Sequence, residues 1–179
     1  MALIALVVVV VLEATSSGHS RPAAPPVHKT VVVHHPSFTA QTDAAIRNTL
    51  SYTPYITQGR PRKREIALTF DDGPGPYTPQ VLAVLKRMRV HGTFFEVGRD
   101  VKAFGANTKA LVAAGDAIED HTQDHPNLSQ LTPARQREQV AEASQAIVAA
   151  GAPAPRLFRP PYGAFNHKTL AMLKRHGLR

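Results

Sequence analysis

Short apolar runs alternate with longer amphipathic stretches over residues 66–176, and this alternation predicts the secondary structure. Ile66, Leu68 and Phe70 recur at every second position, which predicts a buried strand over 66–70. The helix expected next, over 78–89, carries four apolar residues on one face: Val81, Leu82, Leu85 and Met88. The same rhythm continues, with strands expected at 93–97, 117–120 and 156–159 and helices at 107–114, 133–150 and 166–176.

This alternation of strands and helices predicts an α/β fold with a parallel sheet. Local signals support the helix boundaries. Thr132 and Pro133 give a cap followed by proline at the first helical position, and Gly115 and Gly151 follow two helix ends. Each residue cluster that could carry chemistry falls at the carboxyl side of an expected strand, which is the usual active face of α/β folds.

The segment before the domain begins with an apolar stretch from Ala2 to Leu12. Eleven helical residues span about 16 Å, less than a bilayer core of about 30 Å. A secretory signal is therefore favoured over a short membrane anchor, and the protein is expected to be secreted or held in the cell envelope. Three segments are expected: signal peptide or short anchor at 1–18, linker rich in Pro, Ser, Thr and His at 19–60 with a short helix near 41–51, and folded domain at 61–179.

The net charge of +8 is concentrated before the domain. Residues 1–64 hold seven Lys/Arg and two acidic residues, and the excess peaks in the run RPRKR at 60–64. A basic patch can bind nucleic acid. With an export signal and no aromatic-rich RNA-binding motif, attraction to an anionic cell wall or membrane surface is favoured, and a solvated junction is the simplest alternative. The chain has no cysteine, which excludes disulfides and thiolate chemistry.

Two adjacent carboxylates, Asp71 and Asp72, lie in the motif TFDDGP at the end of the first expected strand. Neighbouring side chains at a strand end point in different directions. One carboxylate can therefore bind a metal while the other accepts a proton from water. Taken alone, the pair could equally cap a helix or occupy a turn.

Two further motifs follow later strands. His121 and His125, in HTQDHP, have a spacing that can bring two imidazoles to one cation, although such a pair alone could be a surface accident. Arg159 and Tyr162 lie in RPPYG, where prolines stiffen a loop whose guanidinium could fix a carboxylate or face an oxyanion. Arg159 alone could pair with any acid. The HTQDHP and RPPYG motifs and the aspartate pair all follow expected strands. Together they predict one metal-dependent hydrolase site.

In this order, the three motifs resemble those of the polysaccharide deacetylases of carbohydrate esterase family 4, also called the NodB-homology domain. The similarity covers roughly residues 65–179 and includes TFFEVG, which resembles that domain's second strand. It implies a partial, distorted (β/α) barrel with an unpaired apolar sheet edge. It also implies residue roles: Asp71 as catalytic base, Asp72, His121 and His125 as metal ligands, Arg159 as the group that orients Asp71, and the backbone N–H of Tyr162 as an oxyanion donor.

The resemblance implies a hydrolase that removes N-acetyl groups from peptidoglycan, chitin or another N-acetylglucosamine polymer. Zinc is the expected cofactor, and cobalt or manganese could occupy the same ligands. Two alternatives stay open: a metal-binding but catalytically inactive cell-wall module, and an acetylxylan esterase that uses the same groups. The oligomeric state is not defined by the sequence.

The chain also departs from the family. Relatives carry a later Asp-Trp segment and a Leu-x-His motif whose histidine protonates the leaving amine, whereas this chain has no tryptophan and ends at Arg179. The domain is therefore expected to be incomplete and its turnover impaired about 10²–10⁴-fold. Acidic residues also surround the histidines: solvated charge is expected at Asp116 and Asp124, and either solvation or contact with a metal ligand at Asp120.

Overall fold

The computed structural model describes residues 48, 51, 53, 55–57 and 66–178. The expected signal segment, most of the linker and the basic run at 60–64 lie outside these residues and stay predictions. Of the short helix expected near 41–51, only Asn48 and Ser51 are described, and both are helical. In the described part of the chain, no helix is long and apolar enough to cross a membrane.

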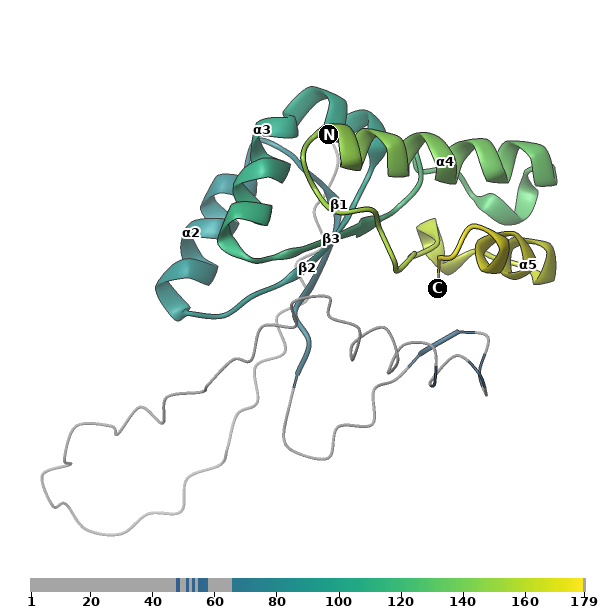
Figure 1. Cartoon of the computed structure of the whole chain (residues 1–179), viewed down its shortest axis with the longest axis horizontal. Helices are drawn as coiled ribbons and strands as arrows, with labels where there is room; N and C mark the ends of the chain where they lie inside the picture. Colours follow the sequence, from purple (N-terminus) through teal and green to yellow (C-terminus); the bar gives the residue numbers. More distant parts are fainter. Residues whose placement is uncertain (1–47, 49–50, 52, 54, 58–65, 179) are drawn as a thin grey trace, which may run out of the picture. The chain divides into compact units, whose positions relative to one another are not determined.

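Three parallel strands form the centre of the fold: β1 (Thr69–Gly73), β2 (Thr93–Glu96) and β3 (Ala117–Asp120). They are paired in the order β1-β2-β3, and the helices α2 (Thr78–Met88) and α3 (Gly98–Ala114) connect them (Figure 1). Parallel neighbours require such crossover connections. The predicted α/β fold with a parallel sheet is therefore confirmed.

The first strand begins later than predicted and is not buried. Ile66 and Leu68 are 88% and 37% exposed, and β1 runs instead through the aspartate pair to Gly73. Phe70 does pack, with its ring stacked on Phe94 at a centroid distance of 4.8 Å. Among the described strands β1 is an edge strand, because β2 is its one partner there. The prediction of a buried strand was wrong because alternation does not reveal whether a second layer covers it.

Helix α2 matches its predicted range to within one residue, but Met88 at its end is 62% exposed and does not join the apolar face. Helix α3 begins at Gly98, well before the predicted start at 107, and bends at Phe104, where φ is −126° and ψ is 30°. The N–H of Gly98 donates to the carbonyl of Thr122 at 3.0 Å. A contact distant in sequence therefore defines the start of α3, and local patterns did not signal it.

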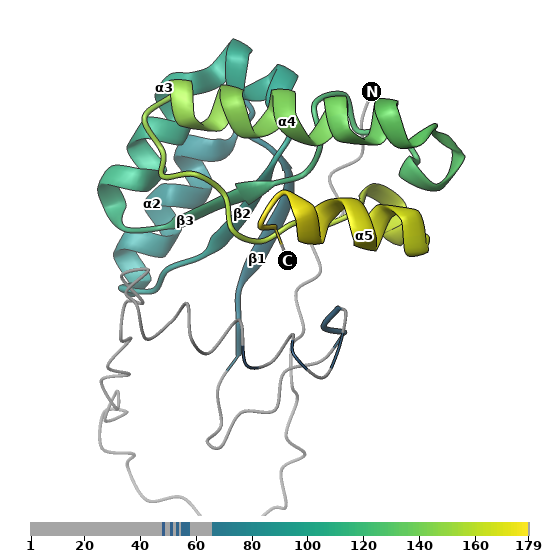
Figure 2. The same cartoon turned by 45° about the vertical axis from the view of Figure 1, so that its right-hand side comes forward.

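Helices α4 (Pro133–Ala149) and α5 (His167–Arg175) lie beside each other (Figure 2) and confirm their predicted ranges to within one residue. The side chain of Thr132 accepts a backbone N–H of the first turn of α4 at 3.3 Å. Asn166 begins α5 with a capping box. Two short 3₁₀ helices complete the described elements: η1 (Leu128–Gln130) and η2 (Pro161–Gly163).

Two buried apolar clusters join these elements. The first involves the sheet, α2, α3 and the end of α4, and contains Leu82, Leu85, Phe94, Val101, Leu111, Ile118, Ala146, Ile147 and Ala152. The second involves η1, α4 and α5, and contains Leu128, Val140, Phe158, Met172, Leu173 and Leu178. Because α4 contributes to both clusters, it connects α5 to the sheet.

The strand predicted at 156–159 was wrong. This segment makes a single bridge to the sheet, between Asp120 and Phe158. Four prolines lie within 153–161, and proline cannot donate a backbone hydrogen bond. The N–H groups of the segment's first two residues donate to the side chain of Glu119 and not to a strand carbonyl. The segment therefore lies beside β3 without forming a ladder.

Candidate active site

The two neighbouring aspartates are separated by a β-bulge. The register of β1 against β2 shifts between Asp71 and Gly73, so Asp72 is an extra residue, with a φ of 63°. Bulges change the direction in which side chains point and occur next to active sites. Here the bulge gives the two carboxylates different partners: Arg159 for the first and the histidine pair for the second.

The carboxylate of Asp72 meets two imidazoles. Its Oδ1 lies 3.3 Å from Nε2 of His121 and 3.0 Å from Nε2 of His125. One ligand atom from each of the three residues lies within 4.8 Å of the others. Ligand atoms of a tetrahedral zinc bound at about 2.0–2.1 Å are about 3.3 Å apart. The separations of 3.3 and 3.0 Å between Asp72 and the two histidines therefore fit a shared cation.

The ring orientation of His121 is fixed by a backbone carbonyl. Its Nδ1 lies 2.6 Å from the carbonyl oxygen of Arg159, and a carbonyl can only accept, so Nδ1 carries the proton. Burial lowers the pKa of His121 and favours the neutral ring, although this carbonyl and the charge of Asp71 act in the opposite direction. Nε2 then presents a lone pair toward Asp72, so the three residues suit a metal ion.

Arg159 binds the other aspartate. Its Nη1 donates to Oδ1 of Asp71 at 2.6 Å and to Oγ1 of Thr69 at 3.0 Å. The guanidinium also lies 4.1 Å from the centroid of the Phe95 ring, within cation–π range. The side chains of Asp71 and Arg159 are 36% and 37% exposed, so the pair is held in place yet accessible from solvent.

Tyr162 lies against the second histidine. The residue is 75% exposed, and its ring meets the ring of His125 edge-on at a centroid distance of 4.8 Å. The arginine motif therefore passes next to the histidine pair. Asp72, His125 and Tyr162 have φ values of 63°, 59° and 59°. Residues other than glycine rarely adopt this left-handed region, so backbone strain is concentrated at this site.

The side chain of Asp120 holds the loop between the two histidines by accepting a hydrogen bond from the backbone of that loop. The carboxylate accepts the N–H of Thr122 at 2.9 Å and the hydroxyl of Ser144 at 2.6 Å, and the residue is fully buried. Burial raises the pKa of Asp120 to about 7, although these hydrogen bonds lower it. Asp120 is thus neither solvated nor directed at a histidine side chain.

The expectation for Asp116 was also wrong. Asp116 is 7% exposed, and its carboxylate accepts the N–H of Gly92 at 2.9 Å, so it is a buried hydrogen-bond acceptor. Asp124 is exposed as predicted, and its carboxylate accepts from the side chain of Gln139 at 2.7 Å.

Sequence reasoning missed Glu119. This residue of β3 is 1% exposed, and its Oε2 accepts the N–H groups of Arg156 and Leu157, each at 2.7 Å. Burial raises the pKa of Glu119 to about 7, although the two hydrogen bonds lower it. The available signal was its place in a parallel strand. Such strands are covered on both faces, so a charged side chain there requires a partner.

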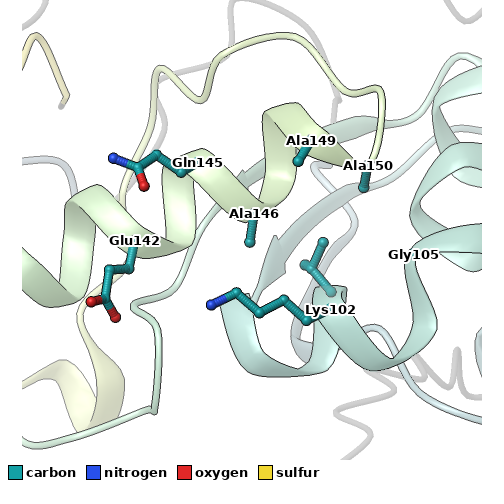
Figure 3. A pocket seen from close by; sticks show the side chains of 8 residues that line it. Lys102, Gly105, Glu142, Gln145, Ala146, Ala149 and Ala150 are labelled. Carbon is teal, nitrogen blue, oxygen red and sulfur yellow. The ribbon is translucent and has the colours of Figure 1, made fainter.

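A groove of about 560 Å³ lies elsewhere, between α3 and α4. Lys102 and Gly105 of α3 face Glu142, Gln145 and the alanines of α4 across it (Figure 3). None of the residues that line it belongs to the three sequence motifs. The chemistry of the candidate site therefore does not involve this groove.

The fold and the site together define a class: an α/β protein whose parallel strands bring a candidate metal-binding triad and an aspartate–arginine pair to one edge. The chain belongs to the polysaccharide deacetylase family, whose model, described as polysaccharide deacetylase, matches residues 58–179. The family resemblance inferred from the three motifs is confirmed. The predicted boundary at 60/61 stays a prediction.

Two relatives and one solved structure illustrate the similarity. The chain is 43% identical over 117 residues to a chitooligosaccharide deacetylase of Bradyrhizobium sp. (strain ANU 289), covering 64% of this chain and 53% of that protein. It is 37% identical over 110 residues to a peptidoglycan-N-acetylglucosamine deacetylase of Bacillus cereus, covering 61% and 40%. A family 4 carbohydrate esterase from Streptomyces lividans, solved with acetate, is similar at a TM-score of 0.62 and 34% identity, covering 63% and 59%. The chain thus spans about half the length of these relatives.

Proposed function

We propose that this chain is a metal-dependent hydrolase that removes N-acetyl groups from a cell-wall or chitin-type polysaccharide containing N-acetylglucosamine. The observation that carries the proposal is the meeting of Asp72, His121 and His125 beside the ion pair of Asp71 and Arg159. The names of the two relatives support the substrate class, because each is a deacetylase of an N-acetylated sugar polymer or oligomer.

In this proposal Asp72, His121 and His125 hold the cation. Two imidazoles and one carboxylate leave a position open, which is the pattern of catalytic zinc sites. Zinc is the proposed metal, and cobalt or manganese would suit the same donors. When bound, the cation supplies Lewis-acid chemistry, polarising the acetyl carbonyl and lowering the pKa of a water.

Asp71 is the proposed general base, which accepts a proton from the water that attacks the acetyl carbon. Arg159 holds one oxygen of this carboxylate at 2.6 Å and so limits its rotation. The guanidinium is itself positioned by its hydrogen bond to Thr69 and its contact with the ring of Phe95. The backbone N–H of Tyr162 is the proposed donor to the oxygen that becomes negative during the attack.

The proposed substrates lie outside the cytoplasm, so we place the activity in the cell envelope or outside the cell. Residues 1–18 would serve export, residues 19–60 would be the linker and residues 61–179 the domain. The basic run at 60–64 would then favour contact with an anionic wall or membrane surface.

The test combines zinc titration with acetate release. The full chain is compared with Asp72→Asn and Asp71→Asn, using N-acetylchitooligosaccharides and peptidoglycan as substrates. We expect Asp72→Asn to lose zinc affinity by about 10-fold or more, because a carboxylate ligand is replaced by an amide. Asp71→Asn should bind zinc like the wild type and lose about 10²–10⁴-fold in rate, because it lacks the base.

The outcomes test metal binding and deacetylase activity separately. Zinc binding that is unchanged in Asp72→Asn would exclude this carboxylate as a ligand. A zinc-loaded wild type that releases no acetate from either substrate would refute the deacetylase function and favour a metal-binding module. Full activity in Asp71→Asn would exclude Asp71 as the base.

A further inference from the structure

Glu119 joins the arginine segment to the sheet. It lies in β3, two positions before His121, and is 1% exposed. One carboxylate oxygen accepts the N–H groups of both Arg156 and Leu157 at 2.7 Å. Two short hydrogen bonds from neighbouring N–H groups to one buried oxygen therefore attach a segment that forms no strand.

The segment that Glu119 holds reaches both halves of the site through Arg159. The N–H of Arg159 donates to the carbonyl of Asp120 at 3.1 Å. The carbonyl of Arg159 accepts from Nδ1 of His121 at 2.6 Å, and its guanidinium donates to Asp71 at 2.6 Å. A shift of this segment along β3 would therefore move the partner of Asp71 and the acceptor that orients His121 at the same time.

Other attachments of the segment to β3 are few in the described part of the chain. It makes one isolated bridge, between Asp120 and Phe158, and the surrounding prolines have no N–H to add. We propose that Glu119 is a positioning residue for the site: its carboxylate fixes the place of 156–159 along β3 and thereby aligns Arg159 with both Asp71 and His121. The kinetic part of this inference rests on the proposed deacetylase function.

Glu96 offers a matched control. It is a buried glutamate of the neighbouring strand β2, it is 0% exposed, and its carboxylate accepts one hydrogen bond, from the hydroxyl of Thr108 at 2.8 Å. Its side chain has no hydrogen bond to the arginine segment among the described residues. Glu96→Gln and Glu119→Gln therefore make the same carboxyl-to-amide change in similar surroundings, and only the second changes the acceptor of the segment's N–H groups.

The first measurement is steady-state deacetylation by the zinc-loaded full chain. We expect Glu119→Gln to lower kcat about 10- to 100-fold with little change in KM, because a small misplacement of a catalytic group has effects of this size. Glu96→Gln should stay within about twofold of the wild type. In an Arg159→Ala background, which removes the guanidinium and keeps the backbone carbonyl, Glu119→Gln should cost less than in the wild type, because its effect through Asp71 is already lost. Equal losses in Glu96→Gln, or an undiminished loss in the Arg159→Ala background, would overturn the proposal.

The second measurement needs no turnover. Nitrogen–proton NMR of the histidine rings reports the Nδ1–H of His121 that donates to the carbonyl of Arg159. We expect this signal in the wild type and in Glu96→Gln, and its shift or loss in Glu119→Gln. An unchanged signal in folded Glu119→Gln would overturn the proposal. If that variant does not fold, Glu119→Asp, whose carboxylate is one methylene shorter, replaces it under the same criteria. A wild type inactive on every substrate would refute the deacetylase function, while this measurement would still decide the role of Glu119.

Discussion

Glu96 provides a direct test of the buried electrostatics of the sheet. Its side chain is fully buried at the end of β2 and accepts one hydrogen bond, from Thr108. The second carboxylate oxygen, Oε1, is buried and has no hydrogen-bond partner among the described residues. Burial raises the pKa of Glu96 from 4.5 to about 7, although the hydrogen bond from Thr108 lowers it. The perturbation is Glu96→Gln, which resembles the protonated acid in shape and cannot ionise.

The sign of the effect follows from the raised pKa. At pH values between the unfolded and folded pKa, the folded protein holds a proton that the unfolded chain has released. The stabilisation is therefore full below about pH 4.5 and is lost as the pH rises through about 7. At roughly 1 kcal/mol per pKa unit, the wild type should lose about 2–3 kcal/mol between about pH 5 and about pH 8.5 through this group alone.

The assay is urea unfolding followed by circular dichroism at these two pH values, with a chelator present so that metal binding does not contribute. Buried Glu119 and Asp120 add to the wild-type slope in the same direction, so the informative quantity is the difference between variant and wild type. The stability of Glu96→Gln relative to the wild type should be about 2–3 kcal/mol greater at the higher pH than at the lower. Glu138→Gln, at a partly exposed carboxylate of α4, controls for the change in net charge. A Glu96→Gln difference that is the same at both pH values would refute the reasoning.

Three further predictions concern packing and use the same unfolding measurement. Gly98→Ala would place a methyl 2.7 Å from the backbone Cα of Ala143, so we expect a loss of about 1–3 kcal/mol. Gly105→Ala, in the same helix, meets Ala150 at an ordinary 3.6 Å and should gain about 0.5–1 kcal/mol; effects of the same sign at both glycines would contradict the packing. Leu111→Ala removes a side chain that is 0% exposed and should cost about 2–5 kcal/mol, whereas a cost below about 1 kcal/mol would show that this cluster is not tightly packed.

Local signals predicted much of the secondary structure. Thr132 and Pro133 marked the start of α4, and Gly115 marked the end of α3, because caps and stop signals act within one helical turn. The motif residues could also be selected from the sequence, since two of the motifs lie at the carboxyl ends of β1 and β3, and the carboxyl ends of parallel strands share one edge. Periodicity and turn chemistry were sufficient for these features.

Contacts between distant segments could not be predicted in the same way. The alternation at Ile66 and Leu68 indicated a buried strand, but exposure depends on which layers cover the sheet. The start of α3 at Gly98 depends on the carbonyl of a loop that follows later in the chain. The segment 156–159 was expected to form a strand, but the carboxylate of Glu119 accepts the N–H of Leu157 that a ladder with β3 would use, and the N–H of Arg156 as well.

The left-handed backbone at Asp72, His125 and Tyr162 has a consequence for attempts to make this protein resist heat. Such conformations cost about 1–3 kcal/mol each, and glycine would adopt them without that cost. Replacement by glycine would therefore relax the chain while deleting two candidate ligand side chains and the ring that touches one of them. At these positions a substitution that raises heat resistance would remove groups that the candidate metal site needs. Substitutions for heat resistance should therefore be sought in the helices and not at this site.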